Sequence, residues 1–126
     1  MQMITKMTTY YKMDFYDTYV IIERLGDIKI DSKIAKETLK IILDHFKGKE
    51  FVIISNRKQN YALDADSYSP SLFKKVKGIA IVSDIPDVKA QAILEQMNFR
   101  NSFAFFDTME NAEDWAKSFS NNYSSI

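Results

Sequence analysis

The 126 residues fit a single domain, 1–126, with a substantial core. The sequence is 46% hydrophobic and 13% aromatic, which is typical of a globular protein. The 17 basic and 17 acidic residues leave a formal charge of zero, which argues against nucleic acid as a partner, because nucleic-acid binders usually carry a basic excess. The absence of cysteine excludes disulfides and thiolate catalysis, and the apolar runs are too short to cross a membrane, so we expect a cytoplasmic protein.

The N-terminal part of the chain predicts a β-hairpin. Residues 7–16 are rich in Thr, Tyr and Phe, which favour strands, and Asp17 is the expected turn before a second strand over residues 18–25. We expect residues 10–15 to pair antiparallel with the second strand, at an edge of the sheet. Gly26 and the aspartate after it predict the next turn.

The next segment carries the clearest helical pattern in the chain. Asp31 or Ser32 can cap its start by accepting hydrogen bonds from free backbone N–H groups. Apolar residues follow at helical spacing along one face, namely Ala35, Leu39, Ile42, Leu43 and Phe46. Gly48 suits the end of this helix. We expect His45, the single histidine, to lie on the surface of its last turn.

Three solid hydrophobic runs predict strands that are buried on both faces, as in a parallel sheet covered by helices. These runs are residues 51–54, 79–82 and 103–106. A helical segment follows each of them, and such alternation implies parallel strands joined by right-handed crossovers. We therefore predict an α/β fold, with an N-terminal hairpin and four βα units in a mostly parallel sheet with helices packed against it. Residues 120–126 are expected to form a frayed tail.

Three helices are predicted in the second half. Ser69 and Pro70 suit the start of a short helix that Gly78 ends, and this helix would carry a small basic patch on its wet face: Lys74, Lys75 and Lys77. Pro86 suits the start of the next helix, whose apolar members are Val88, Ile93, Leu94 and Met97. The last helix carries an apolar stripe of Ala112, Trp115, Ala116 and Phe119.

This order of elements resembles the SpoIIAA-like or STAS domains, named for bacterial anti-sigma-factor antagonists. Residues 51–64, FVIISNRKQNYALD, are similar to the "strand–SNR–NSY" stretch of a branch found in Bacteroidetes-type bacteria. Residues 77–83, KGIAIVS, and residues 105–115, FFDTMENAEDW, are similar to the next strand and the closing helix of that branch. The resemblance implies a module for protein–protein signalling or small-ligand sensing, without enzymatic activity and without a cofactor.

The phosphorylated serine of the antagonists has no clear counterpart. Their Asp-Ser-Ser-Gly-type motif is missing, and the matching residues 64–71 read DADSYSPS. Ser67 and Ser69 are the candidates for phosphorylation, with helix capping by Ser69 as the alternative. Asp64 and Asp66 offer too few oxygen ligands, and no glycine for the turn, to predict a metal site.

The candidate binding residues follow the second predicted buried strand, and they are Ser55, Asn56, Arg57, Asn60 and Tyr61. In open α/β sheets, ligands collect outside the carboxyl ends of the strands. The planar guanidinium of Arg57 could hold a carboxylate or phosphate by two hydrogen bonds. The alternative is that Arg57 and Asn56 only hold the following loop in place.

The leading functional hypothesis is a non-enzymatic interaction module that binds a protein partner, or a second copy as a homodimer, through residues 55–71 and the adjacent helix ends. The alternative is a small-molecule or apolar-ligand domain with a pocket near Arg57. An enzyme using Arg57 and Asp64 is the least favoured reading, because no general base stands beside a nucleophile in any recognisable motif.

Overall fold

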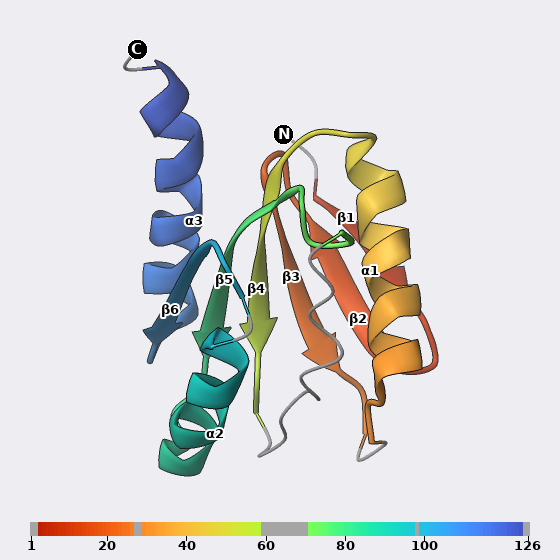
Figure 1. The fold of residues 1–126 in the computed structure, drawn as a ribbon, viewed down its shortest axis with the longest axis vertical. Coiled ribbons are helices and arrows are strands. Elements are labelled where there is room, and N and C mark those ends of the chain that lie inside the picture. The colour runs from red at the N-terminus through yellow and green to blue at the C-terminus, as the bar shows by residue number, and fades with distance from the viewer. Residues whose placement is uncertain (1–2, 27–28, 59–70, 98, 125–126) are drawn as a thin grey trace.

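The computed structural model describes residues 3–26, 29–58, 71–97 and 99–124, with side chains as far as residue 119. The strands within these ranges are β1 (Ile4–Met7), β2 (Tyr11–Phe15), β3 (Tyr19–Arg24), β4 (Phe51–Asn56), β5 (Val76–Val82) and β6 (Ser102–Phe106). The helices are α1 (Ser32–Phe46), α2 (Pro86–Gln96) and α3 (Met109–Ser124). Figure 1 shows these elements in one α/β arrangement.

The strands form a mixed sheet in the order β1-β2-β3-β4-β5-β6. The first three strands pair antiparallel, and β3 to β6 pair parallel. A helix follows β3, β5 and β6. The predicted α/β class is confirmed, with a sheet that is antiparallel in its N-terminal half and parallel in the other.

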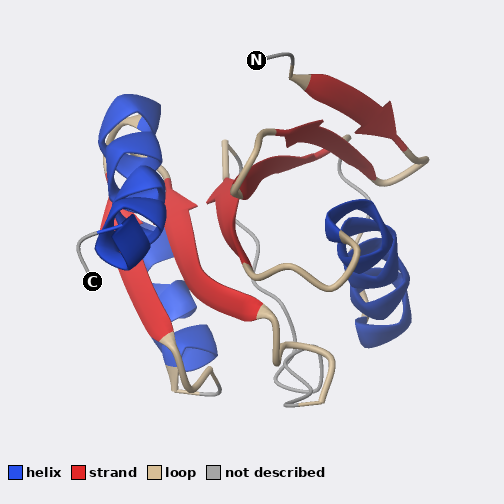
Figure 2. Ribbon diagram, turned by 90° about the horizontal axis from the view of Figure 1, so that it is seen from above, coloured by secondary structure: helices blue, strands red, loops and turns tan. Residues whose placement is uncertain are grey.

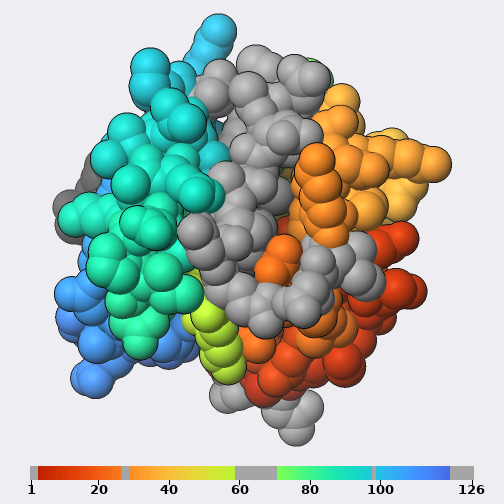
Figure 3. All heavy atoms as spheres, turned by 90° about the horizontal axis from the view of Figure 1, so that it is seen from below, coloured from red at the N-terminus to blue at the C-terminus, as the bar shows by residue number. Residues whose placement is uncertain are grey.

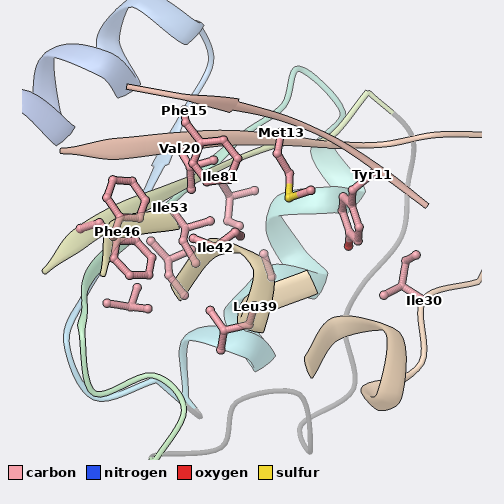
Figure 4. Packing of buried hydrophobic residues seen from close by; sticks show 14 of the residues in the cluster. Tyr11, Met13, Phe15, Val20, Ile30, Leu39, Ile42, Phe46, Ile53 and Ile81 are labelled. Carbon is pink, nitrogen blue, oxygen red and sulfur yellow. The ribbon is translucent and has the colours of Figure 1, made fainter. Parts of the chain in front are cut away.

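Helices cover both faces of this sheet. In β4, Ile53 packs in a core cluster with Leu39 and Ile42 of α1 and Val88 and Ala92 of α2. Successive strand residues point to opposite faces, so the neighbouring β4 residues pack instead against α3. Figure 2 shows α1 and α3 on opposite sides of the curved sheet, and Figure 4 shows side chains of β2, β4 and α1 meeting in the first cluster.

The predicted first strand, residues 7–16, is two strands. The Thr8 hydroxyl accepts hydrogen bonds from the backbone N–H groups of Tyr10 and Tyr11, at 3.1 and 3.0 Å, and so forms a turn between β1 and β2. β1 is therefore the edge strand, and β2 lies one position inside it, with three buried aromatic or sulfur-containing side chains. The predicted antiparallel pairing of residues 10–15 with the second strand is confirmed, but the edge position belongs to β1, so the hairpin is corrected to a three-stranded meander.

The expected cap and apolar face of α1 are confirmed. The Asp31 side chain accepts a hydrogen bond from Ile34 N at 2.9 Å, and the buried face of the helix includes Leu39, Ile42 and Phe46. His45, by contrast, is not a free surface residue. Its ring is half-buried and stacks on Phe15 with ring centroids 4.0 Å apart.

The predicted short helix before Gly78 is not formed in the described residues. Residues 71–75 form a turn, β5 begins at Val76, and Gly78 lies inside that strand. The start predicted for this helix, at Ser69, lies outside the described residues. Gly78 is required for packing, because a Cβ atom there would lie 2.8 Å from the Trp115 ring and 3.1 Å from the Phe119 ring of α3. At the C-terminus, α3 extends to Ser124 and so includes most of the segment expected to be a frayed tail.

Candidate functional site

The structure places the first three candidate residues at the carboxyl end of β4. Ser55 and Asn56 are its last residues, and Arg57 follows directly, with its backbone N–H donating to Val82 O of β5 at 2.8 Å. Arg57 therefore stands at the strand end where it was predicted. The other candidates, Asn60, Tyr61, Ser67 and Ser69, lie outside the described residues, and their roles stay predictions.

The Arg57 side chain is buried and bound by a carboxylate of α2. Its two terminal nitrogens donate to the Glu95 oxygens at 2.5 and 2.7 Å, and its Nε donates to Ser55 Oγ at 3.1 Å. Both charged side chains are only 1% exposed. The two parallel hydrogen bonds are the geometry that a guanidinium offers to a carboxylate. In this structure the carboxylate is supplied by the protein itself.

Asn56 belongs to a different face of the sheet. Its amide donates to Glu23 Oε1 at 3.5 Å, and Glu23 Oε2 lies 3.4 Å from Lys58 Nζ. Alternate strand residues point to opposite faces, so Ser55 and Arg57 lie together and Asn56 lies apart from them. Of the three predicted binding residues that the structure describes, it thus brings together Ser55 and Arg57.

The ion pair fixes how α2 is rotated against the sheet. The buried residues of α2 are Val88, Ala92 and Glu95, which recur at helical spacing. The opposite side of the helix then faces outward, and its apolar residues are Ile93 (46% exposed), Leu94 (66%) and Met97 (78%). The four apolar residues that the sequence predicts for this helix therefore divide. Val88 faces the core, whereas the other three face outward, because the partner of Arg57 takes an inward position. A glutamate in line with Val88 and Ala92 was the sequence signal for this orientation.

α2 lies beyond the carboxyl ends of β4 and β5 (Figure 1). The space-filling view from this end shows α2, in teal, as a large part of the exposed surface (Figure 3). The exposed apolar residues therefore belong to the end of the sheet at which the sequence predicted a binding site.

A small cavity of about 50 Å³ lies between α1 and the sheet. Its polar lining residues include Arg57, Ser55 and Thr38, whose hydroxyl donates to Ile34 O at 2.9 Å. The rest of the lining is mainly apolar and comes from α1, the strands and the turn before β5: Ile22, Ala35, Leu39, Ile42, Ile53, Phe73 and Ile79, with Tyr11.

The described residues also bear on two other kinds of site. No group of three or more His, Asp or Glu side chains stands close enough to hold a metal ion in the ranges that the structure describes. Over the same ranges, no helix combines the length and apolar character needed to cross a membrane.

No family model matches the chain, and no curated protein matches it. One solved structure similar to it is a protein of the DUF3478 family from Shewanella loihica PV-4, itself uncharacterised and described as having a SpoIIAA-like fold. The two share 14% sequence identity, and the alignment covers 91% of this chain and 92% of that chain with a TM-score of 0.59. The chain therefore has a SpoIIAA-like fold, as the resemblance predicts; its placement in a Bacteroidetes-type branch stays a prediction.

Proposed function

We propose that this SpoIIAA-like domain is a non-enzymatic, cytoplasmic interaction module of the kind used in signalling, and that its contact face is the outward side of α2. The observation that carries the proposal is the exposure of Ile93, Leu94 and Met97 on one side of that helix. A surface helix normally turns charged and polar residues to solvent, and clustered apolar side chains on a surface mark interaction sites.

The contact face is uncharged along its length. At 100° per residue, Pro86 and Ala90 fall on the same outward side of α2 as the three exposed apolar residues. Lys89 and the acidic residue after Pro86 lie at the margins of this side. A partner can therefore cover the centre of the face without burying an unpaired charge, which would be costly.

A second copy of this chain is the occupant that suits such a face best. Two identical uncharged surfaces can meet across a twofold axis without like charges facing each other, and twofold dimers are the commonest soluble assemblies. Methionine at the contact adapts its shape to a partner surface. We therefore propose a homodimer formed by α2 packing against α2.

The test is the oligomeric state measured by sedimentation velocity over a range of concentrations. We expect a dimer for the wild type and a monomer for Leu94→Lys, which places a charge at the contact. The matched control is Met7→Lys, an equally exposed apolar residue on β1 at 63% exposure. Helix content by circular dichroism should be the same in all three. A wild type that stays monomeric at roughly millimolar concentration would exclude the dimer.

A small apolar ligand near Arg57 is the second candidate, supported by the cavity between α1 and the sheet. The cavity, at about 50 Å³, is well below the roughly 300–1,000 Å³ of common ligand sites, so its occupant would be a very small molecule. Propanol is a suitable probe. Amide shifts near Leu39 and Ile53 on titration would support binding there, and Ala35→Ile, which fills the cavity, should abolish them.

The proposal also holds that the domain is not an enzyme. A reaction that used Arg57 to bind an anion would first have to displace Glu95 from a buried pair of hydrogen bonds. Asp64, the other residue considered for catalysis, lies outside the described residues.

A further inference from the structure

A second hollow lies at the other end of the sheet, at the amino ends of β4 and β5. The two strands run parallel with Phe51 opposite Val76, and Phe51 N donates to Lys75 O at 3.0 Å. Residues that precede the two strands are therefore neighbours in space although they are far apart in sequence. This pairing brings Lys49 close to Lys75 and Lys77 around one groove.

The groove combines positive charge with apolar walls. Its lining consists of Thr18, Gly48, Lys49, Glu50, Phe51, Val52, Lys75, Lys77 and Phe119. Three lysines and one glutamate give it a local charge of +2, in a chain whose formal charge is zero. The Lys77 side chain is only 21% exposed, and its Nζ lies 3.9 Å from Glu50 Oε1. Thus Lys77 is held in the wall, and the lysine patch predicted for a helix face belongs to a turn and a strand.

The size of the groove suits a small organic molecule. Its volume is about 460 Å³, within the roughly 300–1,000 Å³ of small-molecule sites. The half-buried ring of Phe119 comes from α3 and offers an aromatic surface beside the lysines. Just outside the groove, the exposed Lys47 and Lys74 precede β4 and β5, and the exposed Asp17 precedes β3, so these residues add one net positive charge at this end of the sheet.

We infer that this groove binds a small phosphate monoester with an aromatic or apolar body. A phosphate monoester is close to doubly negative at neutral pH and so matches the local charge of +2, whereas a single carboxylate would leave one positive charge unbalanced. Lysine ammonium groups are suitable phosphate ligands because each acts as a compact charge with several donors. The inference does not depend on the proposed function, because the groove lies at the opposite end of the strands from α2.

The test is a titration with phenyl phosphate, followed by calorimetry and by amide shifts in ¹⁵N spectra. We expect saturable binding, tighter than that of inorganic phosphate, with shifts at Thr18, Gly48 and Lys75. Lys77→Met keeps the alkyl chain and removes the charge, and it should weaken binding by about tenfold or more. Lys40→Ala, which removes an exposed lysine of α1 away from the groove, should bind as the wild type does.

Several outcomes would overturn the inference. They are the absence of saturable binding, equal losses in Lys77→Met and Lys40→Ala, and equal affinity for phenyl phosphate and inorganic phosphate with no effect of Phe119→Leu. A phosphoserine peptide that bound more tightly than phenyl phosphate would identify a phosphorylated protein, not a small molecule, as the ligand. Circular dichroism of each variant would show whether a loss of binding reflects a loss of folding.

Discussion

Replacing Glu95 by glutamine should destabilise the protein strongly while keeping the size of the side chain. The substitution leaves the Arg57 guanidinium without a counter-charge in a site where both side chains are 1% exposed. Breaking a buried ion pair on one side costs about 3–5 kcal/mol, a large share of the roughly 5–15 kcal/mol that stabilises a domain. With a urea dependence of about 1–3 kcal/mol per molar, the unfolding midpoint should fall by about 1 M or more.

The double variant Arg57→Met with Glu95→Leu tests whether the unpaired charge causes the loss of stability. Replacing both charges by apolar residues removes the unpaired ion, so its free energy of unfolding should lie well above that of either single variant. If the free energy of unfolding of Glu95→Gln lies within about 1 kcal/mol of the wild-type value, the ion pair is not desolvated and the reasoning fails.

Two further predictions concern the core. Burial against Phe15 lowers the pKa of His45 below its usual 6.5, with Lys6 and Lys47 contributing. The unfolded chain therefore binds this proton more readily, and the free energy of unfolding measured in urea should decrease as the pH falls through 6.5; His45→Gln should remove that part of the pH dependence. Gly78→Ala should cost about 1–3 kcal/mol, because the added methyl would overlap the Trp115 ring. A stability equal to that of the wild type would show that α3 can move away.

Local patterns in the sequence predicted the elements that local chemistry determines. The cap at Asp31, the apolar stripe of α1 and the buried runs of β4 and β5 all depend on neighbours within a few residues, and the structure has each of them. The class of fold follows from their order.

The features that the sequence did not reveal depend on contacts between distant residues. The inward face of α2 is decided by Arg57, 38 residues before Glu95, and a charged residue is not expected in a core without knowledge of its partner. The sequence around Gly78 resembles the end of a helix, but the residue lies in β5, where the Trp115 and Phe119 rings of α3 leave no room for a side chain. Position at a strand end was enough to find Ser55 and Arg57, whereas the carboxylate that binds Arg57 could not be found in that way.

β1 protects the backbone edge of β2. All four of its side chains are exposed, so it adds little to the core, and its contribution is the backbone pairing with β2. Without it, the core strand β2 would present an open row of backbone donors and acceptors to other chains. With β1 in place, the edge of the sheet carries Lys6, and a charge at an edge position discourages the pairing of strands from different molecules that leads to aggregation. A truncation that removes these first residues would therefore affect solubility before it affects the fold.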